Sequence, residues 1–256
     1  MLFNRYPSHI IISCLALSFI FGGCWKRNAD MGHQGHIMFK AVGDYLHTSG
    51  LDQEDLCVGC PLVLKMSDRR HGNTSLNGVD VSVSPADAAE VVEIGGGQIV
   101  VTALKPVRFH LEVHEQGDLI DSLALRAAEI SFVTYEDARL YTKYTANDTL
   151  FTQSKAVDLD DLISMGTNQK LYFTLVPRDS EGRALIGTLD PAFLPSQKDT
   201  LSFDFSLPIL WGNANEVRVE THGQKPKALS VEIVEALSGQ SRTIEVEVLG
   251  KLVLLK

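Results

Sequence analysis

Two cysteines separated by two residues, Cys57 and Cys60, form the most compact reactive pattern in the chain. This spacing occurs in redox pairs, where a helix N-terminus lowers the pKa of the first thiol. Such a redox fold places an apolar strand directly before the pair, whereas residues 51–56 (LDQEDL) are acidic. A short structural disulfide is therefore the preferred interpretation, and a redox function is the alternative.

The same cysteines have a second possible chemistry, because His33 and His36 precede them at a similar spacing. Two such pairs are the ligand pattern of a zinc ribbon. The histidines fall in a polar stretch without recognisable hairpin turns, and an oxidising compartment favours pairing of the two thiols. A metal site of His33, His36, Cys57 and Cys60 is thus the less favoured alternative.

Three further potential ligands, His110, Glu112 and His114, alternate along a strand-like segment. The two histidines would lie about 13 Å apart on an extended strand. One ion with bonds of about 2 Å cannot reach both, so a solvated strand face is expected. The chain also lacks a serine nucleophile elbow, a zinc-protease motif and a phosphate-binding loop, so the sequence predicts no catalytic residues, no cofactor and no enzyme.

Aromatic residues offer a different kind of site. Four tyrosines fall in strand-like segments, namely Tyr135, Tyr141, Tyr144 and Tyr172. Half-buried packing is the usual role of tyrosine in a strand. A stacking platform for sugar rings is the alternative, although the chain has only two tryptophans, Trp25 and Trp211.

Residues 10–21 (IIISCLALSFIF) form an apolar run preceded by a single cation, Arg5. A membrane-spanning helix needs about 20 apolar residues, so an export signal is the better interpretation than an uncleaved anchor. Two glycines and a cysteine follow the run, and Phe21-Gly22-Gly23-Cys24 resembles the lipobox of bacterial lipoproteins. The resemblance implies cleavage before Cys24, acylation of Cys24 with diacylglycerol and palmitate-like chains, and anchoring in the cell envelope, which we expect to be at the outer membrane. An ordinary secretory signal remains an alternative.

A second resemblance concerns three short triplets, Asp121-Ser122-Leu123, Asp148-Thr149-Leu150 and Asp199-Thr200-Leu201. Each is similar to the O-glycosylation site of Bacteroidota. The resemblance implies a bacterial envelope protein from that group.

The formal charge of the 256-residue chain is −9, and removal of residues 1–23 takes away Arg5 alone, which gives −10. A body this acidic has no electrostatic footprint for nucleic acid. The expected partners are the membrane, through the N-terminal lipid, and a protein or a glycan in the envelope.

Hydrophobic periodicity predicts how the rest of the chain is organised. A polar tether is expected at residues 24–36, and a helix at 37–46 opens a segment, 37–77, that carries the two cysteines. From residue 79 onward apolar residues alternate with polar ones, which predicts a mainly β fold of antiparallel β-sandwiches. We expect two Ig-like or transthyretin-like units, 78–150 and 168–256, joined by a short helix at 157–165, with one large sandwich as the alternative.

These features together favour a lipid-anchored cell-envelope protein whose β-sandwich body is a non-catalytic binding, adhesion or assembly module. A carbohydrate-binding or carbohydrate-processing accessory lipoprotein is one alternative. A redox or metal-binding lipoprotein that uses Cys57 and Cys60 is the other.

Overall fold

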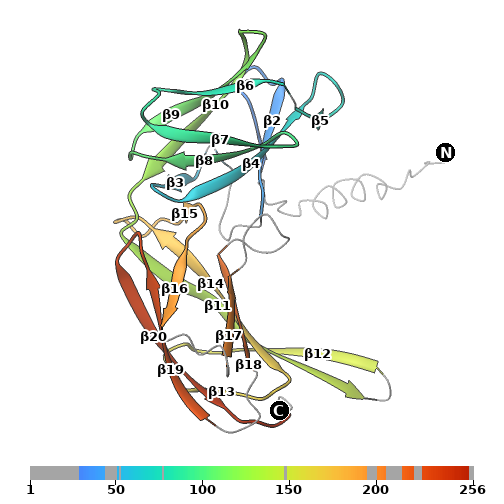
Figure 1. Ribbon diagram of the computed structural model, residues 1–256, viewed down its shortest axis with the longest axis vertical. Helices are drawn as coiled ribbons and strands as arrows, with labels where there is room; N and C mark the ends of the chain where they lie inside the picture. The colour runs from blue at the N-terminus through green and yellow to red at the C-terminus, as the bar shows by residue number, and fades with distance from the viewer. Residues whose placement is uncertain are drawn as a thin grey trace, which may run out of the picture.

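The computed structural model describes residues 29–43, 51, 53–76, 78–146, 149–194, 201–205, 215–221 and 227–253. Every regular element in these residues is a β-strand, and the strands form two modules placed end to end (Figure 1). Cys24 and the expected signal segment lie outside the described residues. No helix with the length and apolarity needed to cross a membrane occurs among those described.

The first module consists of two facing sheets. One has the order β1 (Ala29–Met31), β2 (Ile37–Ala41), β4 (Pro61–Asp68), β8 (Gln98–Ala103) and β7 (Ala89–Gly95), with β5 (Thr74–Ser75) paired to β4. The other has the order β15 (Leu185–Ile186), β3 (Asp55–Cys57), β10 (Asp118–Ala128), β9 (Arg108–Glu115) and β6 (Asp80–Ser84). Fully buried side chains such as Phe39, Phe109 and Leu111 fill the space between them.

The second module repeats this architecture. One sheet has the order β12 (Thr149–Ala156), β11 (Phe132–Ala146), β14 (Gln169–Arg178), β18 (Glu216–Thr221) and β17 (Leu201–Phe205). The facing sheet has the order β13 (Ile163–Met165), β20 (Gln240–Val248), β19 (Lys227–Glu235) and β16 (Pro191–Leu194). Phe173, Met165 and Leu171 are among the largest buried side chains of this core.

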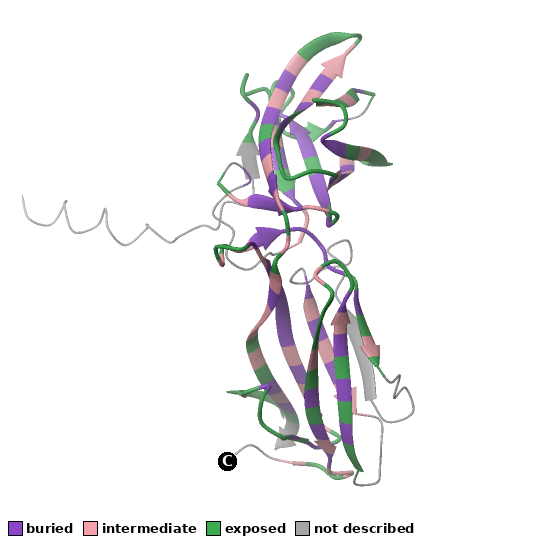
Figure 2. Cartoon of the chain, turned by 90° about the vertical axis from the view of Figure 1, so that its left-hand side faces the viewer, coloured by how far each residue is buried: buried purple, intermediate pink, exposed green. Residues whose placement is uncertain are grey.

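The two-residue periodicity of the sequence corresponds to real burial. Buried and exposed positions alternate along the strands of both modules (Figure 2). In β9, for example, Phe109 and Leu111 are buried while His110 between them is exposed. The mainly β, antiparallel sandwich fold is therefore confirmed, as is the solvated strand face that carries His110.

Two expected helices are wrong. Residues 37–41 form strand β2, which pairs with β1 on one side and β4 on the other, and residues 44–46 of the predicted helix lie outside the described residues. In the segment 157–165, the carboxylate of Asp158 accepts the N–H of Asp160 in a turn, and Ile163–Met165 forms β13, parallel to β20. In both places, sheet pairing outweighs a local pattern that also suits a helix.

The two cores also divide the chain at a different place from the predicted ranges. The first core draws on residues from Ile37 to Ala127, so most of the segment 37–77 belongs to the first sandwich. Apart from Cys57 and Cys60, the second begins at Val133, so β11 and β12 belong to the second sandwich rather than the first. The expected tether, 24–36, includes strand β1.

Candidate functional site

The junction between the modules is the first place where distant parts of the chain meet. Between β14 and β16, strands of the second module, the chain enters the first module as β15. There Leu185 and Ile186 pair in parallel with Asp55 and Leu56 of β3, and Ile186 joins the first core. The two modules are thus joined by hydrogen-bonded strands as well as by the covalent linker after β10.

The Cys57–Cys60 disulfide lies at this junction. Both cysteines are fully buried, and although they flank the turn between β3 and β4, their side chains pack in the second core. Gly187 packs directly on them with a φ of +143°, and a Cβ at Gly187 would overlap the Cβ of Cys60. The predicted structural disulfide is therefore present.

A buried amide fastens the same segment. The Asn215 side chain accepts the N–H of Leu189 at 2.8 Å and donates to the carbonyl of Gly187 at 2.9 Å. The Thr188 N–H donates to the carbonyl of Pro61 at 2.9 Å. Three successive residues are thus tied to both modules, because Pro61 belongs to the first and Asn215 precedes β18 of the second.

The metal site expected as an alternative is not assembled. His36 Nδ1 lies 3.0 Å from the carbonyl of Ile120, and the His33 N–H donates to Ser122, at β10 rather than at the junction. The cysteines, joined to each other, offer no thiolates. Across the described ranges, no cluster of three or more potential ligands occurs.

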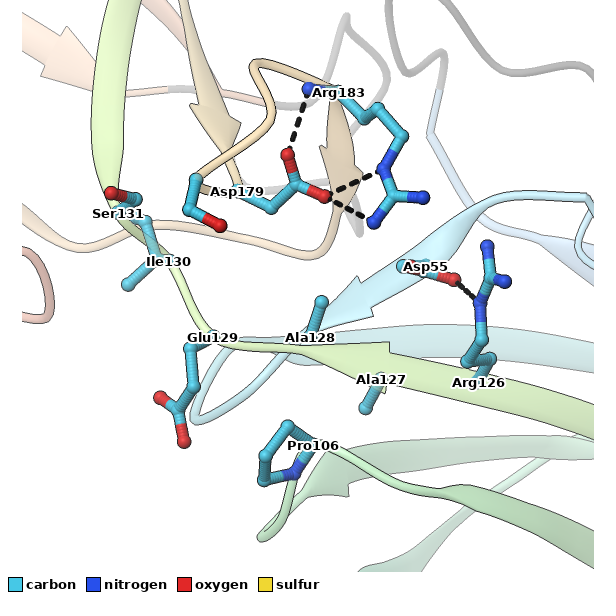
Figure 3. Close-up of a pocket in the computed structure, with 11 residues that line it drawn as sticks. Asp55, Pro106, Arg126, Ala127, Ala128, Glu129, Ile130, Ser131, Asp179 and Arg183 are labelled. Atoms are coloured by element: carbon cyan, nitrogen blue, oxygen red, sulfur yellow. Dashed lines mark hydrogen bonds and ion pairs between the residues drawn. The ribbon is translucent and has the colours of Figure 1, made fainter.

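A cavity of about 420 Å³ opens beside the junction, where the linker 129–131 leaves the first module (Figure 3). Two ion pairs flank it: Arg126 with Asp55 from the first module, and Arg183 with Asp179 from the second. Burial disfavours the charged form of Asp179, yet hydrogen bonds from Arg183 hold the pKa of this carboxyl below its usual value.

The chemistry available in this cavity is limited. Each arginine is paired to a carboxylate, and the described lining holds two serines but no histidine that would activate a hydroxyl. The arrangement braces the junction and offers polar contacts.

Asp121 has a role that the sequence analysis did not identify. Its fully buried carboxylate accepts the backbone N–H groups of Gln34, His36 and Ile37 at 2.7–2.8 Å. A signal was present, because Leu123 and Leu125 put position 121 on the core-facing side of β10. In the triplet Asp121-Ser122-Leu123, which resembles a glycosylation site, the aspartate is therefore a buried structural residue. Asp148, Asp199 and Thr200 lie outside the described residues.

The tyrosines separate into two groups. Tyr135 packs beside Phe173 with Arg242 over its ring, and burial raises the pKa of its hydroxyl. Tyr141 and Tyr172 instead form a half-buried edge-to-face pair, with ring centroids 5.1 Å apart, on the outer face of the β11–β14 sheet. The side chain of Tyr144 lies outside the described residues.

No protein-family model matches the chain, and no curated protein matches it. Among solved structures, domains 4–9 of the surface layer protein SbsC align with 87% of this chain and 32% of their own, at 11% identity and a TM-score of 0.31. The Yersinia pseudotuberculosis adhesin InvE aligns with 86% of this chain and 60% of its own, at 12% identity and a TM-score of 0.31. The Escherichia coli adhesin FdeC aligns with 86% of this chain and 64% of its own, at 12% identity and a TM-score of 0.28. Similarities this low establish no family.

Proposed function

We propose that the chain is a lipid-anchored bacterial cell-envelope protein whose two-sandwich body is a non-catalytic binding, adhesion or assembly module. Support for the anchor comes from the resemblance of residues 21–24 to a lipobox. Support for the body comes from two sandwiches fastened end to end by a shared strand and a buried amide. An outer-membrane location and a Bacteroidota source belong to the same proposal.

The position of β1 is the observation that carries this proposal. This strand begins at Ala29, only five residues after Cys24. An extended chain spans at most about 3.6 Å per residue, so the lipid and the first sandwich would be separated by about 18 Å or less. Acyl chains on Cys24 would hold the first module close to the membrane surface, and the junction would fix the direction in which the second module points.

Cell fractionation with Cys24→Ser tests the anchor. We expect the native protein in the membrane fraction, with an intact mass that lacks residues 1–23 and includes the lipid, and the variant outside that fraction. Cys14→Ser is the matched control, because Cys14 lies in the segment predicted to be removed. Membrane retention of Cys24→Ser, or a native mass that still includes residues 1–23, would refute lipid anchoring.

A further inference from the structure

The outer face of the β12–β11–β14–β18 sheet carries a groove lined by two tyrosines. Tyr141 of β11 and Tyr172 of β14 form its centre, because cross-strand pairing places Tyr141 opposite Lys170 and Tyr172 opposite Arg139. The buried residues Leu140, Leu171 and Phe173 alternate with them and face the second core.

Two hollows adjoin this tyrosine pair and share it. The first, of about 170 Å³, extends toward Lys143 and Thr152. The second, of about 140 Å³, extends along β11 toward Asp137 and Arg139. Each volume is of the order of one monosaccharide, and both hollows include Glu216. The two together form an elongated groove with an aromatic centre.

Some of the cations along the groove form ion pairs and others do not. Lys170 pairs with Glu220 at 2.5 Å, and Arg218 lies 2.9 Å from the same carboxylate. No ion pair of Arg139 or Lys143 occurs among the described residues. These two cations stand four residues apart on one strand face, about 13 Å. Asp137 and Glu216 add two carboxylates to the same lining, so the cations that a ligand can pair with are confined to the Arg139 and Lys143 ends of the groove.

We propose that this groove binds an acidic oligosaccharide, a chain of sugar rings that carry carboxylates. Half-buried tyrosine rings give a sugar ring an apolar surface to pack on while their hydroxyls stay available for hydrogen bonds. Glu216 and Thr152 add polar groups for sugar hydroxyls. Arg139 and Lys143 attract carboxylates at the two ends, and charge-assisted hydrogen bonds to them are the strong ones.

An acidic peptide is the competing occupant, because it would satisfy the same cations. The pair of ring-sized hollows on either side of an aromatic centre favours the sugar, since a peptide that adds to a sheet as an extra strand needs a free strand edge for its main chain. The groove lies on a sheet face, and β11 and β14 at its centre are paired on both sides. This inference specifies the ligand class of the proposed binding role.

Calorimetric titration of the full mature protein in detergent, with a hexamer of galacturonic acid as the probe, tests the site. We expect binding of the acid and at least tenfold weaker binding of its methyl ester, which keeps the rings and loses the charges. Tyr141→Ala and Tyr172→Ala should each weaken binding of the acid about tenfold, equivalent to about 1.4 kcal/mol. Tyr141→Phe and Tyr172→Phe should stay within about threefold, because the rings remain.

Charge variants separate the groove from a general electrostatic effect. Arg139→Gln and Lys143→Gln should each weaken binding of the acid about tenfold and leave binding of the ester unchanged. Lys155→Gln is the matched control. It removes one charge from the same hairpin, but Lys155 pairs with the core-facing Leu140 and so lies on the opposite face. Its titration should match that of the native protein.

Three results would overturn the inference: no binding of the acid, equal binding of acid and ester, or equal weakening by Lys155→Gln. A glutamate hexapeptide that binds as tightly as the sugar acid, with the same loss in Tyr141→Ala, would assign the groove to a peptide instead. Membrane attachment is measured separately, and the soluble Cys24→Ser protein should bind the sugar acid as well as the native one. Failure of the groove and failure of the anchor are thus distinguishable.

Discussion

At the scale of single residues, Asp121 shows how one buried carboxylate organises a loop. Its oxygens accept two N–H groups from the loop between β1 and β2, a third from Ile37 at the start of β2, and a fourth from Ser122 at 2.9 Å. A Cβ at Gly32 would overlap this carboxylate, so the loop closes over Asp121 only because residue 32 is glycine. The burial of this charge is tolerated because it is fully hydrogen-bonded.

We expect Asp121→Asn to lower the free energy of unfolding by about 2–3 kcal/mol, because the amide puts an NH2 group where N–H donors converge. Urea denaturation followed by circular dichroism measures this change. Asp118→Asn is the control, since Asp118 is exposed at the start of the same strand and should change the stability by less than about 0.5 kcal/mol. Equal effects of the two variants would contradict the assigned role.

Asp68 gives a prediction about pH. Side-chain hydrogen bonds from Arg70 hold the pKa of this buried carboxyl far below its usual value of 3.8. A carboxyl whose pKa is lower in the folded state stabilises the fold above its unfolded pKa, and that stability is lost as the pH falls below about 4. The free energy of unfolding should therefore fall less between pH 5 and pH 3 in Asp68→Asn than in the native protein.

Urea titrations at several pH values give the slope of the free energy of unfolding against pH. Asp80→Asn is the control, because Asp80 is exposed on β6. It should keep the native slope. An unchanged slope in Asp68→Asn would mean that the ion pair with Arg70 does not contribute to stability in that range.

Local residue patterns predicted some of these roles and missed others. The spacing of Cys57 and Cys60 was enough to predict their disulfide, because two thiols so close in an oxidising setting find each other whatever the fold. The alternation along β10 indicates that Asp121 faces the core, but the sequence does not show that the loop of Gln34 and His36 lies beside it. The groove at Tyr141 and Tyr172 depends likewise on the register of β11 against β14.

At the scale of elements, long alternating strands were predictable and short ones were not. In β19, Leu229, Val231 and Ile233 are buried on one face. The alternation of apolar and polar residues in the sequence predicts both the strand and its buried face. In β2, the apolar residues of 37–42 fit a helical stripe as well as a strand, and pairing with β4 decides the outcome. Strand β15 has only two residues, and its existence depends wholly on β3.

Gly187 directly follows strand β15 and packs on the disulfide, so a substitution there tests the junction. Gly187→Ala should destabilise the protein by about 3 kcal/mol, because the new Cβ meets Cys60 and the backbone conformation disfavours a side chain. Thermal unfolding measures the loss. Gly182→Ala is the control: its φ of +79° lies nearer the left-handed helical region that a side chain can adopt, and the new Cβ meets no atom within 4 Å. It should cost only about 1 kcal/mol.

A loss for Gly187→Ala no larger than that for Gly182→Ala would show that backbone strain alone is at work. The close contact with the disulfide would then have no energetic consequence. A larger loss is the expected result, since Gly187 combines a more strained φ of +143° with the contact to Cys60 at the point where the two modules meet.

At the scale of the whole molecule, the two sandwiches are expected to behave as one unit. Contacts between modules in one chain usually resemble weak interfaces and allow relative motion. Here a strand from one module extends a sheet of the other, and the Cys57–Cys60 disulfide from the first module is packed in the second core. These are contacts of a protein interior, so the junction should resist bending and transmit unfolding from one module to the other.

The double variant Cys57→Ala/Cys60→Ala tests this coupling. Removing two buried sulfurs from the second core, together with their cross-link, should cost about 2–4 kcal/mol and remove most of the packing between β15 and the turn before β4. Differential scanning calorimetry of the native protein should give one cooperative transition, and the double variant should give two, one for each core.

Val231→Ala is the control, because Val231 is fully buried within the second core alone. It should lower the transition temperature and keep a single transition, since the junction that couples the cores is intact. Two transitions in the native protein would mean that the shared strand does not couple the unfolding of the two sandwiches.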